Sequence, residues 1–390
     1  MLREWQLLLT DSWLRALVSW VPLLIFFILW WIFSAGIPRE QAIGIVDFDR
    51  SDFSRALVRQ YNAHPGLTVV SHFSNTEKGS AAMQNAKINA LVVIPTKFKI
   101  DILKGKSPQV TTFYNSQYLL IGNMIASSLQ TAHATYGAKL EVVKAMSQGD
   151  VGVQALGAAV PIGTQITPLF NSNTNYANFL VSGLIPGSWQ IIIVLITILA
   201  LSRESRLQGL AAWLGKKPIA AIAGKLIPYT LILWAHGAIF LWFMFIYLQW
   251  PMNGSWTILI LGQFLMVVAS QAIGLLLYLL LKDAAHALSM AAAYTAPSFA
   301  FMGITFPASD MTIPAQIWRN FIPVSHYIDI QLHQANHGAS VATALPQMVA
   351  LLLFFVVFIG AYKLAQGIIQ KEKLANKNSQ KNELNEAESI

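Results

Sequence analysis

The chain has 390 residues, of which 55% are hydrophobic and only 11% charged, whereas an average soluble domain carries about 25% charged residues. This deficit argues against a soluble enzyme, and the long apolar runs argue against a nucleic-acid-binding protein despite the net charge of +8. There is no cysteine, which excludes disulfides, thiolate metal sites and cysteine nucleophiles. The 12 Trp, 11 Tyr and 21 Phe suit anchoring at membrane–water interfaces, so the composition predicts a polytopic membrane protein.

The chain begins with a short amphipathic pattern over residues 1–15. Apolar side chains share one helical face: Leu2, Trp5, Leu9, Trp13 and Ala16. Charged side chains lie opposite: Glu4, Asp11 and Arg15. The pattern predicts a helix lying in the membrane interface, and the alternative is a disordered tail leading into the first span.

Six stretches are long and apolar enough to cross a bilayer, whose hydrocarbon core needs about 20 helical residues. We expect transmembrane helices over 16–37, 179–201, 226–248, 256–281, 284–306 and 341–362. The first is too long for a signal-peptide core and has no strong cleavage site, so we interpret it as an uncleaved anchor. The expected architecture is an α-helical polytopic membrane protein with six transmembrane helices.

The distribution of basic residues predicts the orientation. The amino-terminal segment, the 202–225 loop, the turn at Lys282 and the tail from Lys363 together carry 13 Lys/Arg, whereas the hairpin at 249–256 has none and 307–340 has only Arg319. Short loops rich in basic residues stay in the cytoplasm. We therefore expect both termini to be cytoplasmic, with a cytoplasmic tail over 363–390 that becomes disordered from Lys371.

Residues 38–178, between the first two spans, have a different sequence pattern from the spans and predict an extracytoplasmic α/β domain. We expect strands at 42–47, 67–70 and 90–95 with a fourth candidate at 110–114, and helices at 52–61, 76–85 and 117–147. Alternation of strands and helices predicts a small parallel or mixed sheet. An irregular connector is expected over 151–178.

Neither of the chemical motifs in this domain is specific. Asp47, Asp49 and Asp52 form either a metal or nucleotide site or, as we favour, a capping and turn cluster. The segment Gly105-Lys106-Ser107 resembles the end of a P-loop, but the glycine expected five residues before Gly105 is replaced by Ile100. We expect no metal site and no nucleotide site in this chain.

Inside the expected spans the ionisable side chains are His236 and His286. Ion-driven carriers usually keep an acidic or basic group there for the coupling ion, so the pattern argues against a secondary transporter. The 202–225 loop places Leu207, Trp213 and Leu214 at near-helical spacing among basic residues. It is either a helix that docks on a soluble partner or a basic loop held by lipid headgroups.

The segment 307–340 is partly apolar and rich in proline. Short broken helices that re-enter the outer interface must satisfy their backbone against protein or a cavity, which would place them at an exit mouth. The candidate exit-mouth residues are Phe306, Pro307, Met311, Pro314, Pro323 and Tyr327.

The complete arrangement resembles the permease subunit of type-2 ABC exporters, and the resemblance covers essentially the whole chain. Ile45-Val46-Asp47, Ser54 to Val58 and Ala90 to Phe98 are similar to the start of the outer domain in this family. Arg203-Glu204, Gly209, Pro218 and Gly224 to Tyr229 resemble its coupling loop, with Leu210 and Ala212 departing from the usual pattern. Met302 to Pro307, Met311 to Pro314, Pro323 and Gly338 resemble the stretch before its last span.

The resemblance implies a permease in the bacterial inner membrane that exports a lipophilic or amphiphilic substrate such as a drug or lipid. ATP and magnesium would bind to a partner ABC ATPase, while this chain would bind no cofactor and would not itself be an enzyme. A second permease copy or paralogue would complete a dimer, and the outer domain suggests a periplasmic adaptor protein. Membrane lipids are further partners, and no nucleic acid is expected.

The resemblance also assigns the coupling loop that contacts the ATPase. Its candidate residues are Arg203, Glu204, Arg206, Gly209, Trp213, Lys216, Lys217, Pro218 and Lys225. The alternative function is a membrane receptor or assembly scaffold whose outer domain binds a protein ligand. A membrane-embedded hydrolase is disfavoured, because the spans hold no paired carboxylates and no histidine cluster.

Overall fold

The computed structural model describes residues 4, 10–36, 39–147 and 175–388. The chain divides into two compact units: Ile37–Thr167 form one, and Met1–Gly36 with Pro168–Ile390 form the other. The first is a small α/β domain and the second is a helical bundle, so the expected combination of a polytopic membrane protein and an α/β domain is confirmed. Most of the amino-terminal helix expected over 1–15 and of the connector expected over 151–178 lies outside the described residues.

The α/β domain is built on a four-stranded mixed sheet. Its strands are β1 (Gln41–Asp47), β2 (Leu67–Phe73), β3 (Ala90–Ile94) and β4 (Thr111–Tyr114). They lie in the order β2-β1-β3-β4; β1 is parallel to both neighbours, and β4 is antiparallel to β3. The helices are α4 (Asp52–Asn62), α5 (Thr76–Gln84), α6 (Phe98–Leu103) and α7 (Leu119–Ser147). The predicted mixed sheet and its fourth strand are therefore confirmed.

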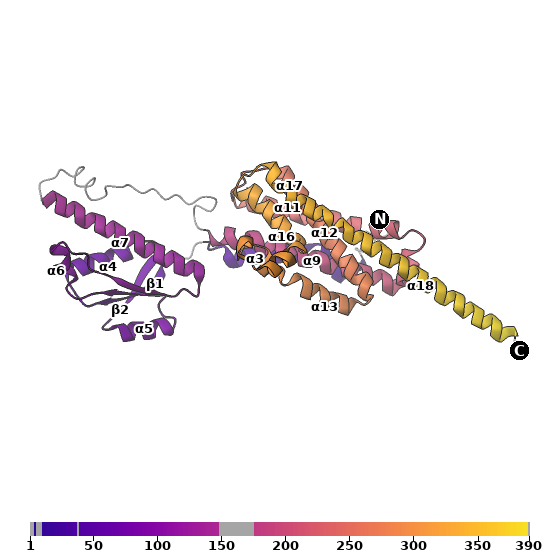
Figure 1. Ribbon diagram of the computed structural model, residues 1–390, viewed down its shortest axis with the longest axis horizontal. Helices are drawn as coiled ribbons and strands as arrows, with labels where there is room; N and C mark the ends of the chain where they lie inside the picture. The colour runs from indigo at the N-terminus through magenta and orange to yellow at the C-terminus, as the bar shows by residue number, and fades with distance from the viewer. Residues whose placement is uncertain (1–3, 5–9, 37–38, 148–174, 389–390) are drawn as a thin grey trace. The chain divides into compact units, whose positions relative to one another are not determined.

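Helices cover both faces of this sheet, with α5 on one side and α4 and α7 on the other (Figure 1). Successive side chains of a strand point to opposite faces, and β1 follows this rule. Ile43 and Ile45 enter the core shared with α4 and α7, whereas Val46 enters the core on the α5 side. At Gly44 an added Cβ would lie 2.5 Å from the Phe73 ring, so the sheet packs closely there.

The aspartate cluster at the end of β1 consists of turn and cap contacts. One Asp47 oxygen accepts hydrogen bonds from the backbone N–H of Asp49 and Arg50, and the other accepts the Ser54 hydroxyl at 2.6 Å. Asp52 pairs with the Lys99 ammonium at 2.7 Å. Among the described residues no group of three or more histidine or acidic side chains is arranged to hold a metal ion.

The described part of the bundle has four helices that are long and apolar enough to span a membrane. They are α9 (Tyr176–Gln208), α11 (Pro218–Leu241) continued by the π-helix η1 (Trp242–Tyr247), α12 (Trp256–Leu281), and α17 (Val341–Leu353) followed by α18 (Phe355–Glu388). A fifth is counted if α2 (Ser12–Val18) and α3 (Trp20–Phe33), which bend by 44° at Ser19, form one span.

The segment expected as the fifth transmembrane helix, 284–306, is broken. It consists of α13 (Ala284–Thr295) and the one-turn helix α14 (Ser298–Phe301), separated by Ala296-Pro297. Proline cannot donate the backbone hydrogen bond that a helix needs at this point. Neither piece alone has the length of a span, because 12 helical residues extend only about 18 Å.

Short helices follow and return the chain to α17. These are the 3₁₀ turn η2 (Ala308–Asp310), α15 (Ile313–Asn320), α16 (Pro323–Gln331) and the π-helix η3 (Leu332–Asn336). Nearly all of α16 is buried in the bundle. Buried glutamines fix this region: Gln190 of α9 accepts the Val324 backbone N–H at 2.7 Å, and Gln331 donates to the Ser182 carbonyl at 2.8 Å.

The carboxyl-terminal tail differs from expectation. We expected disorder from Lys371, but α18 continues without interruption to Glu388. The physical reason is that extending an existing helix fixes one residue for each hydrogen bond gained, whereas starting a new helix is unfavourable. Lys, Glu, Gln and Ala in the tail are good helix formers, so the helix begun by the apolar segment continues.

The α/β domain holds one histidine whose protonation opposes folding. Burial lowers the pKa of His133 in α7, where its Nε2 is hydrogen-bonded to the Tyr61 hydroxyl. The unfolded chain therefore takes up a proton near pH 6.5 before the folded domain does, and stability falls as the pH decreases below that value. We expect amide exchange in α4 and α7 of the full chain, corrected for intrinsic rates, to be faster at pH 5.5 than at pH 7.5.

His133→Gln keeps a hydrogen-bonding side chain but does not titrate in this range, so it should remove much of this pH dependence. His72→Gln, at an exposed histidine of β2, is the matched control and should behave like the wild type. The same pH dependence in His133→Gln as in the wild type would show that His133 is not responsible.

Candidate functional site

The coupling-loop candidates lie where α9 turns back into α11. Gly209 ends α9 with φ 80° and ψ 148°, and Gly215 ends α10 (Leu210–Leu214) with φ 55° and ψ −147°. These backbone conformations are open essentially only to glycine. Pro218 then takes the first position of α11, where its missing N–H is not needed. Two glycines and one proline thus define a tight double turn.

The inner side of this turn packs on the bundle. Ala211 and Leu214 are buried, and Leu214 belongs to a core with Leu226 and Tyr278, while Trp213 packs partly buried against it. The apolar side chains that suggested a docking helix are thus largely used by the chain's own core. Docking through a free amphipathic helix is therefore not what this segment offers, and contact of its basic side chains with lipid headgroups stays a prediction.

The outer side of the turn holds the candidate contact residues for a partner, and six of its exposed residues define what we call the coupling surface. They are Arg206, Leu207, Ala212, Lys216, Lys217 and Ile219. Leu207 and Ile219 are large apolar side chains with 58% and 64% of their surface exposed. The surface combines three cationic side chains with two apolar ones and contains no acidic residue. This composition fits a protein surface with both acidic and apolar groups.

A buried ionic cluster lies beneath the coupling surface. The Lys225 ammonium of α11 is 2.7 Å from a Glu4 carboxylate oxygen and 2.8 Å from a Glu204 oxygen of α9. The Lys225 side chain is 1% exposed and that of Glu204 is 0%. The second Glu204 oxygen accepts the Gln208 amide at 3.2 Å. We call Glu4, Lys225 and Glu204 the ion triad; it joins three segments that are distant in the sequence.

A second ion pair attaches the amino-terminal segment to the same helix end. The Arg203 guanidinium lies 3.1 Å from one Asp11 oxygen, and the other Asp11 oxygen caps α2 by accepting the Leu14 backbone N–H at 3.0 Å. Two consecutive residues of α9 therefore hold this segment. Arg203 binds Asp11 directly, and Glu204 is linked to Glu4 through Lys225. Glu4 and Asp11 are therefore both fixed to the end of α9.

These contacts give the charged residues of the amino-terminal segment partners that the sequence did not suggest: Glu4 is buried and Asp11 binds Arg203, while Trp13 is 81% exposed. The interfacial position expected for this segment stays a prediction. Glu204 and Lys225, which were expected in the coupling loop, are not on its surface. Any part they take in coupling acts through the ion triad. Sequence periodicity gave no signal for this, because the partners lie 21 or more residues apart.

The candidate exit-mouth residues separate into two groups. Phe306, Pro307 and Pro314 are exposed, whereas Met311, Pro323 and Tyr327 are buried. Arg319 lies near them in α15, and its guanidinium is 2.6 Å from the Asp329 carboxylate of α16. This nearly buried pair was not among the sequence candidates, although an isolated arginine in a segment with few charges was a signal that could have found it.

We expect the ion triad to stabilise the bundle mainly through Lys225. Lys225→Met would leave two buried carboxylates without a counter-charge, and removing one partner of a buried ion pair costs about 3–5 kcal/mol. Glu204→Gln keeps the shape and leaves Glu4 and Lys225 as a neutral pair, so its loss of stability should be clearly smaller. Unfolding of the purified chain with increasing SDS, followed by tryptophan fluorescence, measures both.

Lys216→Met removes an exposed lysine of the adjacent turn and is the matched control, with an expected change below about 0.5 kcal/mol. If Lys225→Met and Lys216→Met had equal effects, the ion triad would have no structural role.

Comparisons with known proteins identify the family of the chain. Residues 13–362 match the family model described as ABC-2 family transporter protein. The linearmycin resistance permease protein LnrN of Bacillus subtilis (strain 168) is 29% identical over 127 residues, which are 33% of this chain and 32% of that protein. The alignment thus spans about one third of the relative's length. With the family model extending over most of the chain, the protein belongs to the ABC-2 family of transporters.

Proposed function

We propose that this chain is the membrane subunit of an ATP-driven exporter, energised by a separate ABC ATPase that binds ATP and Mg²⁺. The observation that carries the proposal is the coupling surface, exposed at one end of a bundle whose family is that of ABC-2 transporters. Cationic and apolar side chains are presented together there, on a turn fixed by its own core. The ATPase would dock on this surface.

The ion triad gives the surface a mechanical connection to the membrane helices. Movement of the α9–α11 turn cannot leave Lys225 unpaired without the cost of an isolated buried charge. A displacement imposed by the ATPase would therefore move α9, α11 and the amino-terminal segment together. In this proposal Glu4, Glu204 and Lys225 transmit the movement, while Arg206, Lys216 and Lys217 receive it.

The same end of the bundle is proposed to be cytoplasmic, as are both termini. The carboxyl end of α9, the amino end of α11 and the turn from α12 to α13 meet at this end and carry Arg206, Lys216, Lys217 and Lys282. At the opposite ends of these helices the described residues 249–256 hold no basic side chain. This asymmetry matches the positive-inside rule. In this proposal the protein lies in the bacterial inner membrane with the α/β domain outside.

Six membrane passages follow if two broken helix pairs each cross once. One pair is α2 with α3. The other is α13 with α14; α13 packs on α9 and α12, and α14 packs on α9. The short helices α15 and α16 would then stand at the outer end of the pathway, with Phe306 and Pro314 exposed there. A second permease subunit would complete the pathway, and the α/β domain would meet a periplasmic adaptor.

The proposed substrate is lipophilic or amphiphilic, as in drug or lipid efflux. Two observations support this class: away from the ion triad and the Arg319–Asp329 pair, the side chains buried between the membrane helices are chiefly apolar or uncharged, and the relative LnrN is named as a resistance permease. A pathway formed between such helices would suit molecules that are mainly hydrocarbon.

We expect Arg206→Glu combined with Lys216→Glu to weaken ATPase binding about tenfold or more, equivalent to about 1.4 kcal/mol, because like charges placed together oppose docking. Both side chains are exposed, so folding should be unchanged. The test is purification of the tagged chain from its native membranes in mild detergent, with the bound ATPase quantified by mass spectrometry and its ATP turnover measured.

Lys371→Glu combined with Lys373→Glu makes the same charge change on exposed residues of α18 and is the matched control. It should retain the ATPase at the wild-type ratio. Recovery of the wild-type chain without any ATPase would contradict the proposal and favour a receptor or scaffold function.

A further inference from the structure

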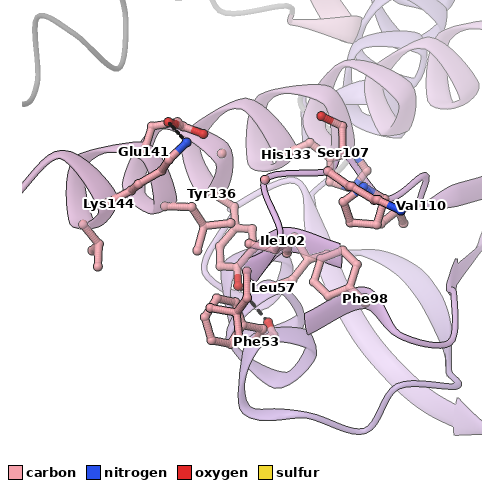
Figure 2. A pocket seen from close by; sticks show the side chains of 17 residues that line it. Phe53, Leu57, Phe98, Ile102, Ser107, Val110, His133, Tyr136, Glu141 and Lys144 are labelled. Atoms are coloured by element: carbon pink, nitrogen blue, oxygen red, sulfur yellow. Dashed lines mark hydrogen bonds and ion pairs between the residues drawn. The ribbon is translucent and has the colours of Figure 1, made fainter. Parts of the chain in front are cut away.

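The α/β domain contains a cavity of about 780 Å³, and none of its lining residues belongs to the coupling surface or the ion triad (Figure 2). Helix α4 contributes Phe53 and Leu57, α6 contributes Phe98 and Ile102, and α7 contributes Tyr136 and Leu140. The segment 105–110 between α6 and β4 forms a further wall. The volume lies within the range of sites that bind small molecules, about 300–1,000 Å³.

The polar side chains inside the cavity are occupied by the fold itself. The Tyr136 hydroxyl donates to the Phe53 carbonyl at 2.9 Å, and the His133 ring is hydrogen-bonded to Tyr61. Figure 2 shows Tyr136, Ile102 and Leu57 close together beneath α7. With these hydrogen bonds already made, the surface left for a ligand in the interior is chiefly hydrocarbon and aromatic.

The rim, in contrast, is polar and cationic. Lys106 and Ser107 lie on one wall, while Lys144 and Glu141 of α7 form an ion pair at 3.7 Å on another. Lys106 is exposed and makes no ion pair with a described residue. Across residues 39–144 there are 12 basic and seven acidic side chains, so the surroundings attract anions as well.

Gly137 offers a position from which the cavity can be tested. It lies on the cavity wall within α7, and a Cβ placed on it would meet no described atom within 4 Å. Glycine inside a helix is less favourable than alanine by about 1 kcal/mol. Glycine is not required here by close packing, and the backbone of Gly137 does not have a positive φ that would favour glycine. Because Gly137 is exposed and lines the cavity, a large side chain here has open space into which it can extend at the cavity mouth.

We propose that this cavity binds a single-chain amphiphile with an anionic carboxylate or phosphate head. The hydrocarbon chain lies against Phe53, Phe98 and Leu140, and the head group lies at the rim beside Lys106. The site belongs to the α/β domain and does not depend on the proposed ATPase, because its residues all come from α4, α6, α7 and the segment 105–110. The proposal thus adds a ligand-binding site in the α/β domain to a chain of a transporter family.

The test uses the full chain in phosphatidylcholine nanodiscs and a fatty acid carrying a photoreactive diazirine in its chain. After irradiation, mass spectrometry locates and quantifies the labelled peptides. We expect labelling of residues 98–110 and 133–144, lowered at least tenfold by Gly137→Phe, which fills the cavity. Gly137→Ala is the matched control and should be labelled like the wild type, since its methyl group is small and favours the helix.

Competition defines the head group. Excess oleate should suppress labelling of these peptides and oleyl alcohol should not, while Lys106→Gln should weaken the effect of oleate several-fold. Oleyl phosphate beside oleate distinguishes a phosphate from a carboxylate preference. Labelling confined to the membrane helices, or equal labelling of Gly137→Phe and Gly137→Ala, would overturn the proposal. Amide exchange of α7 in both variants shows whether the domain has remained folded.

Discussion

The ion triad is the constraint on which the arrangement of the bundle depends. An ammonium group buried among apolar helices is tolerable only beside carboxylates, and Lys225 has two of them within 2.8 Å. Because Glu4, Glu204 and Lys225 come from three segments, the triad fixes the start of the chain, the end of α9 and the start of α11 against each other. Separating any one segment would expose a charge to a medium that solvates it poorly. The three segments therefore behave as one mechanical unit.

This constraint explains why the two sides of the α9–α11 turn differ. The side chains that face the bundle, Leu214 and Trp213 among them, hold the turn in place, and the triad prevents it from sliding along the helices. The outward side chains are then free to meet a partner without any role in folding. In the proposed role the surface must be both exposed and rigidly supported, and opposite sides of the same short segment provide the exposure and the support.

Much of the fold follows from patterns that are local in the sequence. Long apolar runs predicted α9, α12 and the helices around 341–362, and alternating short runs predicted the strands of the mixed sheet. The triad could not be predicted in this way, since Glu4 and Lys225 are paired by tertiary packing and no periodicity connects them. The break at Pro297 was visible in the sequence, but the apolar content of 284–306 outweighed it. Coupling to a partner was inferred from resemblance, whereas the burial of Glu204 required the structure.

The glycines show most clearly that residue type alone does not reveal the structural role of a position. Gly209 and Gly215 are required by backbone conformations with positive φ, and Gly237 by close approach, because a Cβ there would lie 2.5 Å from Trp189. Gly137 has neither reason, yet it stands in a helix where glycine is unfavourable. All four look alike among the 24 glycines of the sequence. Conformation and packing account for three of them, whereas Gly137 shares its open surroundings with other helical glycines such as Gly224 and Gly360. Its place on the cavity wall, and not its residue type, makes it the position at which the proposed hydrocarbon site can be filled and tested.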